Sequence, residues 1–141
     1  MKLVDNCVFC KIIKGELPCC KLYEDDKIFV FLDIAPFNLG HALLIPKVHC
    51  HSITTLPKEY LDALIEKAPE IAAAVMHSTG ADGFNLLLNN GSCAGQEVPH
   101  VHLHVIPRFT TDDNIYFAPK KKYDNDEEMN ELADKIRSRL G

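Results

Sequence analysis

The stretch His100-Val101-His102-Leu103-His104-Val105-Ile106 alternates histidine with aliphatic residues. A period of two predicts a β-strand, in which successive side chains point to opposite faces of a sheet. We expect this strand to span Val101–Ile106, with its aliphatic residues on the core face. The other face would then present three imidazoles in a row, each about 7 Å from the next.

Three of the seven histidines of the chain share this face, a poor fit to a chance surface pattern. One tetrahedral zinc holds each ligand nitrogen at about 2 Å. On a regular strand His100 and His104 would be about 13 Å apart, so one ion cannot bind all three. At most one or two of them are metal ligands. The others can act near neutral pH as nucleophile, base or acid, and we rank catalysis first.

The loop before this strand, NNGSCAGQEVP at 89–99, is rich in small and amide residues. Gly91 and Gly95 permit close approach of a ligand to the backbone, and amide side chains offer neutral donors to phosphate oxygens. A glycine-rich loop on its own is more often an ordinary turn. Beside a row of histidines, it favours a phosphate site.

The rest of the chain predicts four more strands and three helical segments. The strands are expected at Lys21–Glu24, Lys27–Asp33, His41–Pro46 and Phe84–Asn89, and the helical segments at 7–14, Leu56–Met76 and Asp126–Leu140. Thr55 is the expected cap of the middle helix, and Pro69 should kink or divide it. This order predicts an α+β fold with a mainly antiparallel five-stranded sheet, one long central helical segment and a C-terminal helix.

Length and composition fit one globular domain over residues 1–141, with 47% hydrophobic and 25% charged residues. The net charge of -5 argues against a nucleic-acid partner, which needs a basic face. No apolar run is long enough for a signal peptide or a membrane span. We therefore expect a cytoplasmic protein without a membrane partner, whose six cysteines are reduced thiols or metal ligands.

Cys7 and Cys10 form a CxxC pair, which is compatible with zinc, with a redox pair or with chance. A thioredoxin-like redox pair needs a βαβ context, which the expected antiparallel sheet does not supply. Zinc would need two more ligands. Composition does not choose them among the histidines.

The stretch 100–106 matches the motif His-φ-His-φ-His-φ-φ, where φ is apolar, of the histidine triad (HIT) superfamily. The match continues into the preceding GQ at 95–96, GHALLIPKVH at 40–49 and CVFCKIIKGELP at 7–18. The chain resembles the Hint-like branch of that superfamily over about residues 7–109, and 110–141 would be a C-terminal extension. The resemblance implies a HIT-like fold, a purine nucleotide or nucleoside phosphoramidate as ligand, and a homodimer with adjoining sheets.

The resemblance also implies a role for each matching residue. His102 resembles the nucleophile that attacks the α-phosphorus and becomes transiently nucleotidylated, His104 the residue that binds the same phosphate, and His41 the histidine that supports them. The other expected ligand contacts are the loop amides Asn89 and Gln96, the Val98 backbone N–H, the ribose carboxylate Asp33, and the apolar purine slot Phe9, Ile12, Leu17 and Phe31. Ordinary core packing is the alternative for the purine slot.

Zinc-bearing members of the branch resemble this chain at CxxC, at the histidine of PKxH and at the first triad histidine. This similarity implies a structural zinc held by Cys7, Cys10, His49 and His100, with His51 as a competitor for the place of His49.

The activity implied by the resemblance is hydrolysis or transfer on nucleoside phosphoramidates of the adenosine 5'-monophosphoramidate type. The alternatives are a dinucleoside polyphosphate hydrolase and a nucleotide-sensing or partner-binding module with little catalysis. A purely structural zinc protein is a further alternative, but it leaves His102 and His104 unexplained.

Glu97 departs from the family pattern, because many relatives carry serine or threonine at this position. An ionised Glu97 would repel a phosphate, a protonated one could donate a proton to the leaving group, and a solvent-facing one would do nothing. We favour a role at the leaving group.

Overall fold

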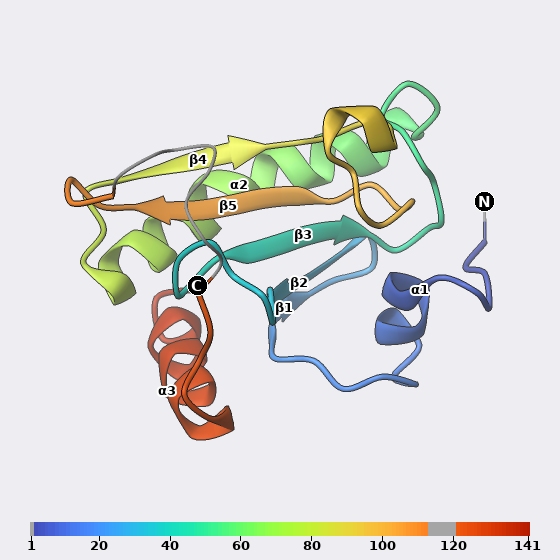
Figure 1. The fold of residues 1–141 in the computed structure, drawn as a ribbon. Helices are drawn as coiled ribbons and strands as arrows, with labels where there is room; N and C mark the ends of the chain where they lie inside the picture. The colour runs from blue at the N-terminus through green and yellow to red at the C-terminus, as the bar shows by residue number, and fades with distance from the viewer. Residues whose placement is uncertain (1, 113–120) are drawn as a thin grey trace.

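The computed structural model describes residues 2–112 and 121–141, so the part of the expected C-terminal extension at 113–120 lies outside the described residues. It confirms the α+β fold with one five-stranded antiparallel sheet (Figure 1). Its elements are α1 (Val8–Ile13), β1 (Lys21–Glu24), β2 (Ile28–Leu32), β3 (Ala42–Pro46), α2 (Lys58–Thr79), β4 (Gly83–Leu87), a 3-10 turn at Ser92–Ala94, β5 (Leu103–Arg108) and α3 (Asp126–Arg137).

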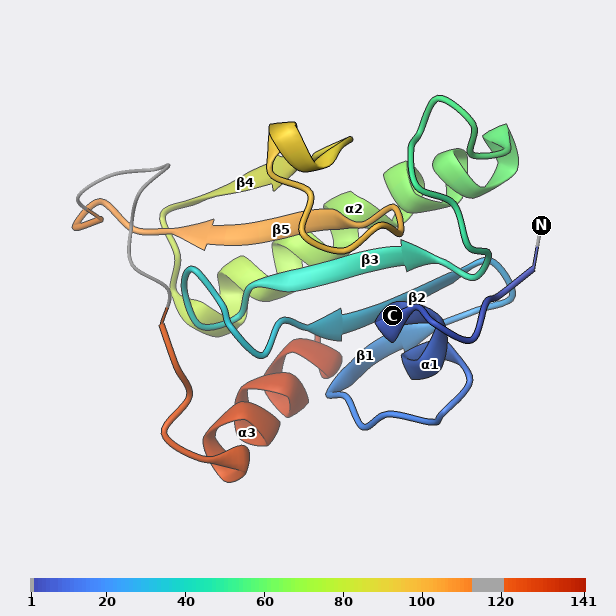
Figure 2. The same cartoon turned by 45° about the vertical axis from the view of Figure 1, so that its right-hand side comes forward.

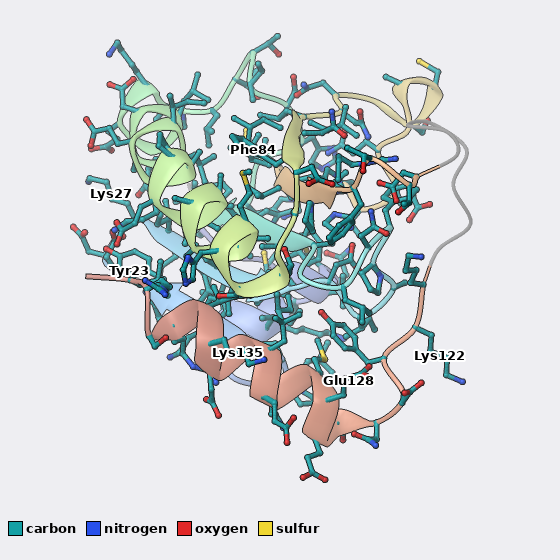
Figure 3. The ribbon with its side chains drawn as sticks, turned by 90° about the vertical axis from the view of Figure 1, so that its left-hand side faces the viewer. Tyr23, Lys27, Phe84, Lys122, Glu128 and Lys135 are labelled. Atoms are coloured by element: carbon teal, nitrogen blue, oxygen red, sulfur yellow. The ribbon has the colours of Figure 1, made fainter. Side chains whose placement is uncertain are left out.

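The sheet has the order β1-β2-β3-β5-β4 and is covered on both faces (Figure 2). Helices α2 and α3 lie side by side on one face (Figure 3), whereas α1 lies on the other. Every residue of β2 and β3 is buried as a result. This explains why both strands are continuous apolar runs rather than alternating ones.

The pairing register aligns three side chains across the α1 face of the sheet. Phe31 of β2 pairs with Leu43 of β3, and Leu43 in turn pairs with His104 of β5. Residues that pair across neighbouring strands point to the same face. His104 therefore extends an apolar row that α1 covers only in part.

β5 begins at Leu103, two residues later than the sequence predicts. The expected burial of Val101, Leu103 and Val105 in the core is confirmed. The expected regular spacing of the three imidazoles is wrong, because His100 and His102 precede the strand. The ring centroids of His102 and His104 are 4.8 Å apart.

Helix α2 runs without interruption through Pro69, so the expected division at this residue is wrong. Proline removes the hydrogen bond to the carbonyl four residues earlier, here that of Ile65. Both residues are exposed, and water can hydrate that carbonyl. The helix begins after Pro57, without a side-chain cap, so Thr55 is not its cap.

The remaining boundaries agree with expectation to within about three residues. β4 ends at Leu87 rather than Asn89, and α3 ends at Arg137 rather than Leu140. Asn125 caps α3, since its side-chain oxygen accepts the N–H of Glu128 at 2.8 Å. Within the described ranges, no helix has the length and apolarity needed to cross a membrane.

Candidate functional site

A cavity of about 410 Å³ opens on the α1 face of the sheet, between α1, the end of β2 and the loop before β5. Its wall is largely apolar with a few polar groups, as is usual for small-molecule sites. It brings together nine of the residues expected at the site: Phe9, Ile12, Leu17, Phe31, Asp33, Glu97, Val98, His102 and His104.

His102 is buried at the base of this cavity and has a defined tautomer. Its Nδ1 lies 2.7 Å from the backbone carbonyl oxygen of His100. A carbonyl only accepts, so Nδ1 carries the proton and donates it. The lone pair of the neutral ring is then on Nε2, the nitrogen that can attack an electrophile.

Burial lowers the pKa of His102, because the charged imidazolium loses its hydration. The bond to the His100 carbonyl and the negative charges of Asp33 and Glu97 act in the opposite direction, and burial prevails. Both the tautomer and the neutral state therefore favour nucleophilic chemistry at Nε2.

A second chain of hydrogen bonds orients His104. The N–H of Phe37 donates to Nδ1 of the buried His41 at 3.1 Å, so the proton of His41 is on Nε2. This Nε2 lies 2.8 Å from Nδ1 of His104, which accepts. A neutral His104 then carries its own proton on Nε2. The geometry supports the expectation that His41 positions His104.

Asp33 follows β2 and turns back onto this pair. Its Oδ1 accepts the N–H of Ala35 at 2.9 Å, which fixes the carboxylate at the cavity wall. Its Oδ2 lies 3.8 Å from Nε2 of His41. The carboxylate thus lies beside His41 as well as on the cavity wall.

The structure does not place Asn89 and Gln96 among the cavity-lining residues. The Gln96 side chain accepts the N–H of Gly91 at 2.7 Å and donates to the carbonyl of His51 at 2.8 Å. Asn89 donates to the carbonyl of Gly95 at 3.4 Å. In this structure both amides hold the loop in shape.

Four donors expected for zinc lie together behind the cavity: Cys7, Cys10, His49 and His100. Nδ1 of His100 is 3.4 Å from Sγ of Cys7 and 3.5 Å from Sγ of Cys10, and Nδ1 of His49 is also 3.5 Å from Sγ of Cys10. Zinc bonds of about 2.3 Å to sulfur and about 2.0 Å to nitrogen, at the tetrahedral angle, give a sulfur–nitrogen separation of about 3.5 Å. The four donors therefore fit a tetrahedral ion.

The outer hydrogen bond of His100 also suits a metal ligand. Its Nε2 lies 3.0 Å from the carbonyl oxygen of Pro46, so Nε2 carries the proton and Nδ1 keeps its lone pair toward the two thiols. Burial lowers the pKa of His100 to about 4, which keeps the ring neutral. The competitor His51 is exposed and does not belong to the group.

The sequence did not single out seven other residues of the cavity wall, namely Val8, Pro18, Cys19, Leu32, Ile34, Ala35 and Leu43. The strand pairing identifies Leu43, because it places Leu43 opposite Phe31 on the same face of the sheet. Ile34 stands almost fully exposed at the mouth of the cavity. In the sequence, only the position of Ile34 next to Asp33 indicates that it belongs to the cavity wall.

Comparison with known proteins agrees with this geometry. The HIT domain family model matches residues 14–111. An adenosine 5'-monophosphoramidase of Schizosaccharomyces pombe is 36% identical over 135 residues, which cover 96% of this chain and 98% of that protein. An adenylylsulfatase of Arabidopsis thaliana is 50% identical over 106 residues, 75% of this chain, and the match spans 54% of that protein's length.

Solved structures are similar over nearly the whole chain. The crystal structure of a zinc-bound histidine triad family protein from Mycobacterium smegmatis has a TM-score of 0.85 and 35% sequence identity. The match covers 96% of this chain and 93% of that one.

The hydrogen bonds predict one tautomer for each of two buried rings. Long-range ¹H–¹⁵N correlation spectra should find the proton on Nδ1 of His102 and on Nε2 of His41, because the neighbouring carbonyl and N–H leave no other arrangement. The exposed ring of His51 serves as the control, with averaged tautomers. A proton on Nε2 of neutral His102 would contradict the assignment of the nucleophilic nitrogen.

Proposed function

Since this chain belongs to the histidine triad (HIT) family, we propose that it hydrolyses nucleoside phosphoramidates at the α-phosphorus through a covalent nucleotidyl-histidine intermediate. The observation that carries the proposal is the His102 ring, whose tautomer leaves a lone pair on Nε2 at the base of the cavity. The monophosphoramidase relative supports the substrate class.

The apolar half of the cavity suits a purine. Phe9 and Phe31 pack edge to face with ring centroids 5.5 Å apart, and Ile12 and Leu17 complete that wall. The Asp33 carboxylate at its edge can accept hydrogen bonds from ribose hydroxyls. A nucleotide held in this way directs its phosphate toward His102 and His104.

The first step forms a bond between Nε2 of His102 and phosphorus and breaks the P–N bond of the substrate. The leaving nitrogen keeps the bonding electron pair and takes a proton from water. His102 is now a cation, with its Nδ1 proton held by the His100 carbonyl. The carboxylates of Asp33 and Glu97 stabilise this charge.

In the second step the oxygen of a water molecule bonds to phosphorus and its proton passes to solvent. The N–P bond breaks and its electron pair returns to Nε2, which releases the nucleoside monophosphate. The Nε2–H of His104 and the Val98 backbone N–H are the donors that would hold the phosphate oxygens in both steps.

A second candidate activity follows from the adenylylsulfatase relative. Cleavage of an adenylyl sulfate or a dinucleoside polyphosphate would use the same nucleophile but release an anion instead of an amine. Nucleotide sensing with little turnover is the alternative without catalysis. Phosphoramidate hydrolysis, cleavage of an anionic leaving group and nucleotide sensing differ in which substrates are turned over. A turnover assay therefore distinguishes them.

His102→Ala should lower turnover of an adenosine phosphoramidate by at least about a thousandfold while AMP binding persists, because only the nucleophile is lost. In a rapidly quenched wild-type reaction, mass spectrometry should place an adenylyl group on the peptide that carries His102.

The matched control is His77→Ala, which removes an imidazole from α2 on the opposite side of the sheet. It should retain wild-type turnover. Turnover by His102→Ala close to the wild-type rate would overturn the mechanism, and a wild type that binds AMP but turns over no substrate would favour the sensing module.

We propose that the cluster of Cys7, Cys10, His49 and His100 holds one structural zinc. With all four positions filled by protein there is no open site for chemistry. The ion would tie the segment before α1 and the start of α1 to the segment that follows β3 and the segment that precedes β5. It would thereby hold the α1 wall of the cavity against the sheet.

Metal analysis should find one zinc per chain, and Cys10→Ser should lose it and lower the melting temperature by about 5–10 °C. Chelation of the wild type should cause the same drop, and added zinc should reverse it. Cys93→Ser, at an exposed cysteine, is the control. A metal-free wild type that melts at the same temperature as the zinc-loaded form would reject the site.

We also propose a homodimer that uses the edge strand β4. Among the described residues this strand pairs only with β5, and it exposes Phe84, Leu86 and Leu87, the first of them labelled in Figure 3. An open apolar edge favours pairing with a second sheet. Sedimentation at micromolar concentration should give twice the chain mass of 15.8 kDa, and Leu86→Lys should shift it toward the monomer. A wild-type monomer would contradict the proposal.

A further inference from the structure

The loop between β2 and β3, residues 33–41, carries two parts of the site. Asp33 is its first residue and His41 its last, and the N–H of Phe37 within it donates to Nδ1 of His41. The N–H of Asp33 donates to the carbonyl of His41 at 2.9 Å, which closes the base of the loop. The tautomer of His41, and through it the proton on Nε2 of His104, therefore depends on how this loop is held.

The chain segment before α3 contacts this loop at two points. The backbone N–H of Lys121 donates to the carbonyl of Pro36 at 2.6 Å. This carbonyl belongs to the same planar peptide group as the N–H of Phe37, so the bond fixes the direction in which that N–H points. The phenol oxygen of Tyr123 accepts the N–H of Gly40 at 2.9 Å. Both contacts therefore act on peptide groups next to the hydrogen bond between Phe37 and its histidine acceptor.

Tyr123 is suited to hold Gly40 in one position. Its side chain is buried in the core that α2 and α3 cover, and burial raises the pKa of Tyr123 to about 12, so the hydroxyl stays neutral. Gly40 has a backbone φ of +98°, and a Cβ on it would lie 2.7 Å from Cγ2 of Thr79 in α2. The loop is thus packed closely against α2 at this point. Loss of the phenol oxygen would leave a buried N–H without this acceptor.

We propose that Tyr123 is a positioning residue for the reaction, whose hydroxyl acts through Gly40 and His41 to hold His104 in the orientation that donates to the phosphate. This inference rests on the proposed function and adds to it a segment beyond residue 111, where the HIT domain match ends. Tyr123 does not line the cavity on the α1 face, so its effect passes through the loop. A preorganised donor acts on the charge that develops in the transition state, so the effect should appear in kcat.

Tyr123→Phe removes the hydroxyl and keeps the ring. It should lower kcat for an adenosine phosphoramidate about tenfold, because a misplaced donor stabilises the transition state less. KM should change by less than about twofold, since α1 and β2 supply the proposed purine wall. A variant that is only less stable would lose folded protein and keep the kcat of the folded fraction. Both constants are therefore measured where circular dichroism shows a fully folded chain.

The matched control is Tyr23→Phe, which also removes one hydroxyl hydrogen bond. The Tyr23 hydroxyl donates to Oδ2 of Asp25 at 2.8 Å, and its ring lies under the ammonium group of Lys67. Tyr23 lies on β1 and is labelled in Figure 3. Because its contacts do not include the loop, Tyr23→Phe should keep the wild-type kcat.

A double-mutant cycle tests whether the effect passes through His41. In a His41→Ala background the route to His104 is already broken, so Tyr123→Phe should lower kcat by less than about twofold further. A loss of about tenfold in both backgrounds would mean that Tyr123 acts in another way and would overturn the inference.

A measurement without substrate keeps the test independent of turnover. The Nε2 proton of His41, donated to Nδ1 of His104 across 2.8 Å, should give a resolved downfield ¹H–¹⁵N signal in the wild type. Tyr123→Phe should broaden or remove this signal, because a looser loop speeds its exchange with water. Tyr23→Phe should keep it.

A Tyr123→Phe variant that keeps the wild-type kcat, or that keeps the His41 signal unchanged, would overturn the inference while leaving the hydrolase intact. A wild type that turns over no phosphoramidate would instead overturn the proposed function. The His41 signal would then still decide whether Tyr123 holds the loop.

Discussion

His100 links three parts of the site through its ring and its backbone carbonyl. Its Nε2–H binds the carbonyl of Pro46 at the end of β3, its Nδ1 faces the two thiols of the cysteine pair, and its own carbonyl accepts the proton of His102. One buried residue thereby connects the sheet, the proposed metal ligands and the proposed nucleophile. If this ring turned over, the lone pair would leave the thiols and the outer hydrogen bond would be lost.

Two short relays set the protonation pattern of the site. Each begins at a backbone group that can act in one way only. The carbonyl of His100 can only accept a hydrogen bond, and the N–H of Phe37 can only donate one. They give His102 a lone pair and His104 a proton on the corresponding Nε2 atoms. The two chemically identical side chains are thus suited to the different roles proposed for them, nucleophile and phosphate donor, because their surroundings differ.

Much of the fold could be predicted because its signals are local. The apolar runs of β2 and β3 and the alternation around Leu103 depend on residues close together in the chain. The errors arise where tertiary context outweighs a local rule. Pro69 stays inside a helix whose solvent-facing side tolerates the lost hydrogen bond. β5 starts late because the backbone N–H groups of His100 and Val101 donate to the carbonyls of Val98 and Cys50, which lie outside the strands of the sheet.

Residue patterns along the chain predict the elements, the alternation that separates the histidines from the core, and the types of group available for chemistry. Those follow from spacing along one chain. Tertiary contacts set the nitrogen that holds the proton in each ring, engage Gln96 within the loop, and place Glu97 at the border of two cavities. Partners as distant in sequence as Pro46 and His100 meet through strand pairing and loop packing, and no local pattern records how close they come.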